Sequence, residues 1–154
     1  MDATLPATAS GGVTMPLSQD HEGLRERLRR AADLAEAGHL RQARTEFRAF
    51  QAALERHVRA EEEVLFPLFE VRVGLVGGPT VLMRDEHRRM ADQVRAMAQA
   101  LDRDDHTAFT EPRALFGELF LAHASKEERF LYMTLDRLLS SEQRAALAAR
   151  LRQS

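Results

Sequence analysis

Two stretches of the chain carry the same pair of potential metal ligands at the same spacing. One reads His57-Val-Arg-Ala-Glu61 and the other reads His123-Ala-Ser-Lys-Glu127. Residues four apart in an α-helix lie one turn apart on the same face. A histidine nitrogen and a carboxylate oxygen from one helix can therefore point into the same space and bind a cation there.

Two further histidines repeat this arrangement. His21 and His87 are 66 residues apart, and the same interval separates His57 from His123. The chain is therefore predicted to contain two helical hairpins of one design, each with one single histidine and one His-x-x-x-Glu pair. In a bundle of two such hairpins, these side chains would meet at similar depth. The candidate metal ligands are His21, His57, Glu61, His87, His123 and Glu127.

The predicted burial of the two glutamates favours a metal site. The spacing of apolar residues places Glu61 and Glu127 on the core-facing sides of their helices, and no Lys or Arg falls on the predicted core faces. A buried carboxylate is costly unless it is paired or coordinated. Each carboxylate has two oxygens and can bridge two cations, while neutral imidazoles bind from outside, about two per ion. The alternative is a bundle with buried histidine–glutamate hydrogen bonds and no metal.

Helices must position these residues, and the sequence has helical character almost throughout. It is rich in Ala, Leu, Arg and Glu, with apolar residues at spacings of three and four. Helices are predicted over residues 16–37, 40–73, 80–101, about 110–138 and 142–152, and no strand is predicted. Pro67 suggests a kink, and Thr110 with Pro112 suggests the start of the fourth helix. The predicted fold class is all-α, an up-down-up-down four-helix bundle with a short C-terminal fifth helix.

The predicted core face of the fourth helix extends beyond its two ligands. Its further members are Phe116, Phe120, Phe130, Leu131 and Leu138. Tyr132 falls beside this face, near the predicted site. It is interpreted as a packing residue, with a role toward bound oxygen species as the alternative.

The acidic residues next to the candidate ligands are expected at the surface. Asp20, Glu86, Glu62 and Glu128 all fall off the core-facing stripes. A hydrogen bond from a ligand histidine to Glu62 or Glu128 is the alternative for those two residues. His39 falls in a predicted turn and is interpreted as exposed.

The bulk composition fits one soluble domain. The 154 residues suit a single core, predicted over residues 14–152 after a flexible tail at 1–13. The sequence has no cysteine, which excludes thiolate ligands, iron–sulfur clusters and disulfides. A net charge of -2 and the lack of a long apolar run argue against nucleic-acid and membrane partners. No signal peptide is recognised, so a cytoplasmic location is expected.

The order of the candidate ligands resembles that of the hemerythrin-like (HHE cation-binding) domain family. The matching residues are His21, His57-x-x-x-Glu61, His87 and His123-x-x-x-Glu127, within a resemblance that covers about residues 14–140. Members of the family bind a non-haem di-iron centre, so the resemblance implies two iron ions as cofactor. The ligand types alone also suit manganese or zinc. The implied partner is a small diatomic ligand, O2 or NO, or peroxide.

The chain departs from the oxygen-carrying members of that family at two places. Those carriers have a His-x-x-x-His pair on the third helix, whereas His87 has Met83 four residues before it and Ala91 four residues after it. They also use an aspartate where this chain has Glu127. The resemblance therefore implies binding or sensing of O2, NO or iron rather than oxygen storage. An enzyme acting on peroxide or O2 is the alternative, and a bundle with a purely structural polar core is the third interpretation.

Overall fold

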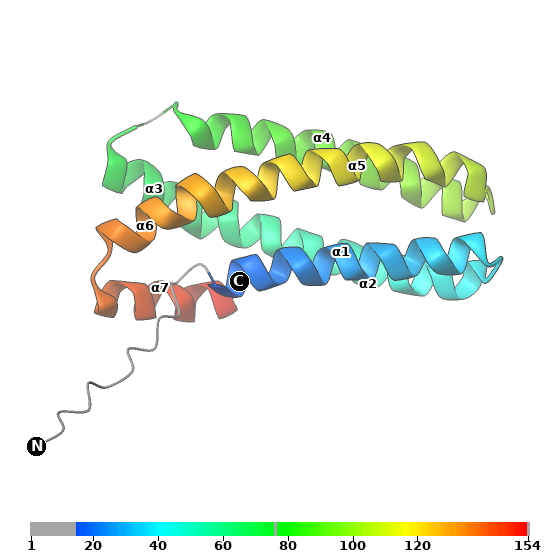
Figure 1. Ribbon diagram of the computed structural model, residues 1–154, viewed down its shortest axis with the longest axis horizontal. Helices are drawn as coiled ribbons and strands as arrows, with labels where there is room; N and C mark the ends of the chain where they lie inside the picture. Colours follow the sequence, from blue (N-terminus) through cyan, green and yellow to red (C-terminus); the bar gives the residue numbers. More distant parts are fainter. Residues whose placement is uncertain (1–14, 76, 154) are drawn as a thin grey trace, which may run out of the picture.

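Four long helical segments form a bundle, and a fifth, shorter helix lies at one end of it (Figure 1). The computed structural model describes residues 15–75 and 77–153, so the predicted tail at 1–13 lies outside the described residues. The predicted all-α fold is confirmed, and no strand occurs in the described ranges. The elements are α1 (Met15–Glu36), α2 (Leu40–Ala60), η1 (Glu61–Leu65), α3 (Phe66–Val73), α4 (Pro79–Asp102), α5 (His106–Lys126), η2 (Glu127–Tyr132), α6 (Met133–Leu138) and α7 (Ser141–Gln153).

The long segments are arranged as two antiparallel hairpins. α1 packs along α2, and α4 packs along α5. The segments α2, η1 and α3 follow one another without a break, and so do α5, η2 and α6. Gly38 follows the end of α1, with a φ of 79° that other residues rarely adopt. The up-down-up-down order follows from these short connections.

The fourth long segment begins one turn earlier than predicted. α5 starts at His106, and the side chain of Asp105 accepts a hydrogen bond of 3.0 Å from the backbone N–H of Ala108. The predicted start at Thr110 is wrong because this acidic cap satisfies a free backbone N–H group at an earlier position. Pro112 consequently lies inside the helix rather than in its first turn.

Two π-helical turns change which side chains face the core. η1 begins at Glu61 and η2 begins at Glu127. A π turn holds one more residue than an α turn, so the side chains after it are displaced around the helix axis. For this reason the predictions that Phe130 and Leu138 face the core are wrong, and these side chains are 46% and 47% exposed. The prediction for Leu131 is confirmed, and Tyr132, Leu135 and Leu139 take the other core positions. The irregularity expected at Pro67 lies just before that residue, in η1.

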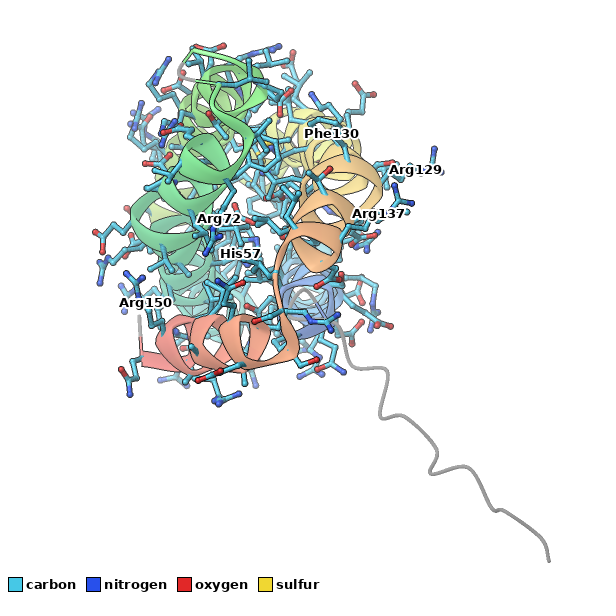
Figure 2. All side chains as sticks on the ribbon, turned by 90° about the vertical axis from the view of Figure 1, so that its left-hand side faces the viewer. His57, Arg72, Arg129, Phe130, Arg137 and Arg150 are labelled. Atoms are coloured by element: carbon cyan, nitrogen blue, oxygen red, sulfur yellow. The ribbon has the colours of Figure 1, made fainter. Side chains whose placement is uncertain are left out.

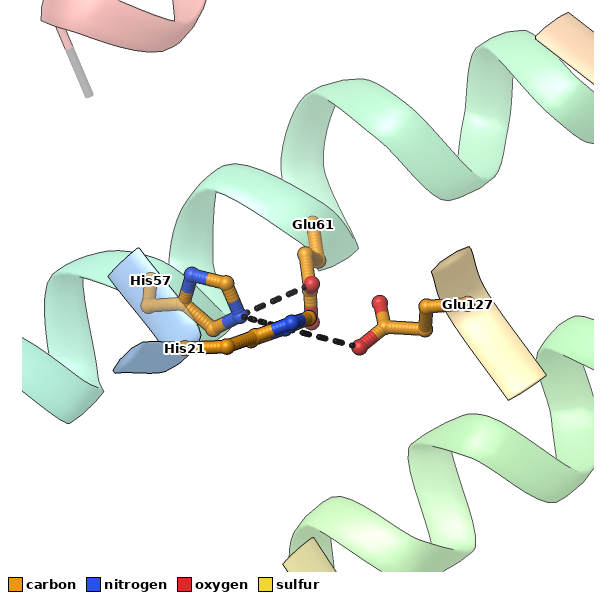
Figure 3. A group of neighbouring side chains, drawn as sticks. All are labelled: His21, His57, Glu61 and Glu127. Atoms are coloured by element: carbon orange, nitrogen blue, oxygen red, sulfur yellow. Dashed lines mark hydrogen bonds and ion pairs between the residues drawn. The ribbon is translucent and has the colours of Figure 1, made fainter. Parts of the chain in front are cut away.

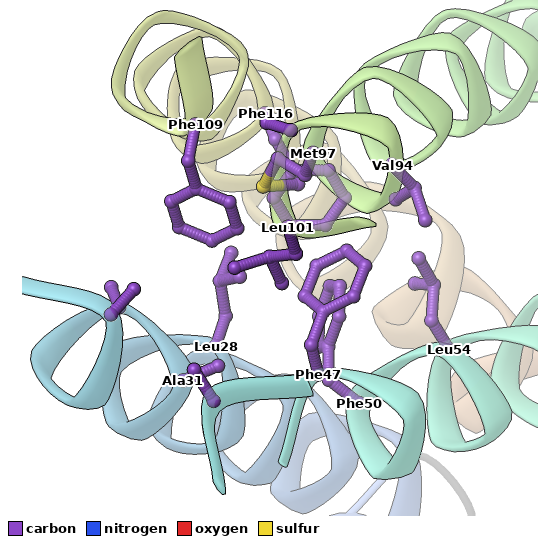
Figure 4. Close-up of a cluster of buried hydrophobic side chains, with 14 of the residues drawn as sticks. Leu28, Ala31, Phe47, Phe50, Leu54, Val94, Met97, Leu101, Phe109 and Phe116 are labelled. Carbon is purple, nitrogen blue, oxygen red and sulfur yellow. The ribbon is translucent and has the colours of Figure 1, made fainter. Parts of the chain in front are cut away.

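Two apolar clusters fill the bundle, one on each side of a polar layer. The first lies toward the two hairpin turns (Figure 4) and includes Leu24, Leu54, Met90 and Phe120. The second lies toward the opposite end and includes Leu17, Val64, Met83 and Leu131. On every long segment the candidate ligands lie between a residue of one cluster and a residue of the other. All six candidate ligands therefore meet in a single layer.

α7 packs on the second cluster. Leu147 is buried there and Leu151 packs against it, so one face of this helix is apolar. In Figure 2, which looks along the bundle, α7 lies beside α1 and α2. Among the described helices, none combines the length and the hydropathy that crossing a bilayer requires.

Candidate metal centre

The four candidate histidines form two close pairs in the polar layer. Nε2 of His21 lies 3.1 Å from Nε2 of His57, and Nε2 of His87 lies 3.0 Å from Nε2 of His123. Each pair comes from one hairpin. All four side chains are at most 6% exposed. We call the His21–His57 pair and its surroundings the first half of the site, and the His87–His123 pair and its surroundings the second half.

Glu61 lies between the two halves. Its Oε1 is 2.9 Å from Nε2 of His57, and its Oε2 is 3.1 Å from Nε2 of His87. The fully buried carboxylate thus presents one oxygen to each half. It is also shared by the two groups of residues whose donor atoms lie close enough to hold one ion each. This is the arrangement expected of a carboxylate that bridges two cations.

Glu127 approaches both halves from η2. Its Oε1 lies 3.3 Å from Nε2 of His21 and 2.9 Å from Nε2 of His123. Figure 3 shows Glu127 facing His21, His57 and Glu61 across the layer. Both oxygens of Glu127 and Oε2 of Glu61 are buried and accept no hydrogen bond from the described part of the chain. Buried oxygens without partners are costly, and a cation would satisfy them.

Each histidine contacts a second carboxylate with its outer nitrogen. The distances from Nδ1 to the carboxylate oxygen are 2.8 Å for His21–Glu128, 3.4 Å for His57–Asp20, 2.7 Å for His87–Glu62 and 2.8 Å for His123–Glu86. An ionised carboxylate can only accept a hydrogen bond, so Nδ1 donates and a neutral ring presents the lone pair of Nε2. The outer carboxylates therefore hold the tautomer that metal ligation requires.

With these tautomers, the space between the two histidines of each half suits a cation. In each half, two Nε2 lone pairs point toward one another, 3.1 Å apart in the first half and 3.0 Å apart in the second. A carboxylate oxygen lies beside each pair, and these groups repel one another unless a positive charge lies between them. Imidazole nitrogens and carboxylate oxygens suit iron, manganese and zinc. The donor set therefore fits a dinuclear site with two histidines for each ion.

The carboxylates around the histidines also favour a positive charge in this layer, either a proton or a metal ion. Burial lowers the pKa of His57, but the charge of Glu61 and hydrogen bonds to Asp20 and Glu61 outweigh burial and raise the pKa to about 10. Burial likewise lowers the pKa of His123, and the close carboxylates of Glu127 and Glu61 raise it to about 10. Burial and the charge of Glu61 raise the pKa of Glu127. Protons and metal ions would thus compete for the same nitrogens.

The prediction that Glu86 is a surface residue is wrong. Glu86 is 7% exposed, accepts the hydrogen bond from Nδ1 of His123 and contacts the ammonium group of Lys126. The residue lies off the apolar stripe, but the neighbouring helix α5 covers it. A signal was present in the sequence, because Glu86 and Asp20 are also 66 residues apart.

Glu62 and Glu128 hydrogen-bond ligand histidines, which was the alternative interpretation of these two residues. Glu62 and Glu128 are half-buried, and each contacts a ligand histidine from the opposite hairpin. They too are separated by 66 residues. Asp20 is 56% exposed, as expected of a surface residue, yet it reaches the outer nitrogen of His57. The repeated interval thus marks the whole set of outer carboxylates as well as the candidate ligands.

Tyr132 reaches the ligands with its hydroxyl group. Oη donates a hydrogen bond of 2.9 Å to Oε1 of Glu61 and lies 3.5 Å from Nε2 of His21. Burial and the charge of Glu61 raise the pKa of Tyr132 well above its ordinary value, so the hydroxyl group keeps its proton. The residue 66 positions earlier is Phe66, whose ring stacks on His87 at a centroid distance of 5.6 Å. At this position the two halves therefore differ in one hydroxyl group.

One family model matches the chain. It is described as hemerythrin, hemerythrin HHE cation binding domain, and it matches residues 16–135, a range that contains all six candidate ligands. No curated protein and no solved structure is significantly similar to the chain.

Proposed function

The chain belongs to the hemerythrin HHE cation-binding family, and we propose that it holds two iron ions and binds a small diatomic molecule, O2 or NO, at them. The observation that carries the proposal is the inner geometry. Two Nε2 pairs, at 3.1 Å and 3.0 Å, stand on either side of a glutamate that presents one oxygen to each pair. A metal-free polar core would need an added proton in each pair, because the Nδ1 protons already bond the outer carboxylates.

Each half of the site would supply two histidines and one oxygen of Glu61 to one ion. His21 and His57 would hold one ion with Oε1 of Glu61, and His87 and His123 would hold the other with Oε2. The carboxylate from η2 lies within reach of one histidine from each half. The choice of iron rests on the family, because manganese and zinc suit the same donors.

The surroundings of the site restrict what can reach it. The six candidate ligands are at most 6% exposed, and the two apolar clusters close the layer on both sides. Such a setting suits a small molecule better than an organic substrate, which needs a larger pocket. When bound, ferrous iron supplies the electrons for binding or reducing O2 and related molecules. The outer carboxylates would hold the imidazoles in place throughout.

A second candidate function is an enzyme that consumes peroxide or O2, and Tyr132 favours it. The phenolic hydroxyl group is buried beside His21 and Glu61, on the side of the first half. A protonated donor at this place can hydrogen-bond a small molecule that enters the first half. Catalytic turnover would distinguish this function from reversible binding.

Gas binding and peroxide turnover by the iron-loaded chain test the two candidates. We expect NO or O2 to change the absorption spectrum in a saturable and reversible way, and His57→Ala to remove most of the change. His39→Ala is the matched control, because His39 is exposed and lies outside the site. Catalytic loss of H2O2 that His57→Ala abolishes would favour the enzyme instead. An iron-loaded chain that responds to none of these molecules would refute both candidates.

A further inference from the structure

A cavity of ≈ 320 Å³ opens beside the metal centre, where α1, α2 and the end of α7 meet. His57 and Ala60 of α2, both buried, form part of its wall. Arg27, Arg56 and Arg152 also line it, one from each of the three helices. The metal centre makes no use of these arginines.

The cavity has an excess of positive charge. Three arginine residues line it together with one acidic residue, Asp20, whose carboxylate is engaged with the outer nitrogen of His57. Within residues 15–75 and 77–153, none of the three arginines forms a hydrogen bond or an ion pair. A guanidinium group binds phosphate and carboxylate groups through two parallel N–H donors. Three of them at one cavity suit an oxyanion.

Small side chains keep the cavity open in the first half, whereas the matching place in the second half holds a lysine. The residue 66 positions after Ala60 is Lys126, whose ammonium group contacts Glu86. In the first half, the methyl side chain of Ala60 cannot form the matching ion pair with Asp20. Gly23 of α1 lines the same cavity, and a Cβ atom there would meet nothing within 4 Å. The positively charged residues here are instead the three arginines that line the cavity.

α7 completes the cavity. Leu147 is 3% exposed in the second apolar cluster, and Leu151 packs against that cluster. These two contacts hold the last turns of α7, so that Leu151 and Arg152 line the cavity with α1 and α2. α7 contributes no candidate metal ligand, but it places the third arginine at the cavity.

We propose that this cavity binds a small molecule through a phosphate or carboxylate group, outside the metal centre and next to His57. The volume of ≈ 320 Å³ exceeds that of a lone oxyanion and lies near the lower end for small-molecule pockets, about 300–1,000 Å³. The oxyanion would bind between the guanidinium groups of Arg27, Arg56 and Arg152. The site does not depend on metal, because none of the three arginines is a candidate ligand.

Calorimetric titration of the full chain tests the proposal, with inorganic phosphate and citrate as separate probes at constant ionic strength. We expect at least one probe to bind with a Kd below about 1 mM. Arg27→Gln, Arg56→Gln and Arg152→Gln should each weaken that binding about tenfold. Arg48→Gln is the control, because Arg48 is exposed on α2, the same helix as Arg56.

The outcomes separate the two ligand chemistries and can overturn the proposal. Tighter binding of phosphate indicates a phosphorylated ligand, and tighter binding of citrate indicates a carboxylate ligand. The proposal is wrong if neither probe saturates, or if Arg48→Gln weakens binding as much as the three cavity variants do. Metal content is measured on each sample, so failure here is distinguishable from failure of the metal site. Circular dichroism confirms that each variant is folded.

Discussion

The two halves of the candidate metal centre have a similar inner geometry and different surroundings. A tyrosine hydroxyl group lies against Glu61 on the side of the first half, where the second half has a phenylalanine ring. The outer partner of His57 is the exposed Asp20 at 3.4 Å, whereas the outer partner of His123 is the buried Glu86 at 2.8 Å. A repeated spacing thus places the candidate ligands of both halves alike, and we expect the residues around them to make the two halves differ in metal affinity.

Removal of the shared carboxylate should have the largest effect, because it acts on both halves. Glu61→Gln replaces a carboxylate, which presents one oxygen to each half, with a neutral amide that has only one oxygen. We expect metal content to fall from about two ions per chain to well below about one. Elemental analysis after reconstitution measures this. Glu63→Gln, an exposed position on the same turn, is the control and should keep both ions. Two ions retained by Glu61→Gln would refute the bridging role.

Removal of one histidine should empty one half and leave the other. His57→Ala is expected to lose the ion of the first half, and His123→Ala the ion of the second, so each variant keeps about one ion per chain. Metal stoichiometry and the spectrum of a cobalt-substituted sample report which half is filled. If either variant loses both ions, the halves do not bind independently.

The metal-free protein should lose stability as the pH rises, with a contribution from each half. The folded-state pKa values of His57 and His123, about 10, exceed the unfolded value of about 6.5. The stability from these groups is complete below the unfolded pKa and is lost as the pH rises through the folded pKa. The Tm of the chain in EDTA should therefore fall between about pH 7 and about pH 10. Metal affinity should rise over the same interval, because metal ions replace these protons. A flat or rising Tm would contradict the raised pKa values.

Loss of an outer carboxylate should weaken the second half more than the first. Glu86→Gln removes a buried, short contact to His123 and is expected to lower metal affinity there by about 10–100-fold. Asp20→Asn removes a longer, exposed contact to His57 and should cost only a few-fold. Competition with a chromophoric chelator measures both affinities. Equal losses would show that burial of the outer carboxylate does not matter.

Exchange of the two aromatic residues should have the smallest effect. Tyr132→Phe makes the first half resemble the second, and it frees Oε1 of Glu61 from a hydrogen bond worth about 1 kcal/mol. We expect metal affinity in the first half to rise a few-fold and the metal-free protein to be slightly less stable. Phe66→Tyr is the reciprocal variant, and it should change the second half only. Stepwise metal titration measures the affinity of each half. An equal change in both halves for Tyr132→Phe would contradict this prediction.

The candidate ligands could be predicted from sequence because their spacing is set by helix geometry. A four-residue interval places a histidine and a glutamate on one helical face, and the 66-residue interval relates one hairpin to the other. The structure brings all six candidate ligands together in one layer. The fold class followed from the same periodicity.

The features that escaped prediction depend on contacts between segments or on local changes in helix type. The π turn at Glu127 adds a residue to one turn, so Phe130 leaves the core although its spacing is that of a core residue. Glu86 lies off the apolar stripe of α4, and its burial comes from α5 and from Lys126. Asp105 begins α5 early through a cap that competes with Thr110 as a start signal. Periodicity along one helix carries no information about these neighbours.

Whether the chain holds two iron ions is decided by its metal content after anaerobic reconstitution with ferrous iron. The purified full chain is loaded, freed of excess metal and analysed for iron per chain. We expect about two iron ions per chain, one of them lost in His57→Ala and the other in His123→Ala. Iron well below about one ion per chain, in a protein that circular dichroism shows to be folded, would contradict it.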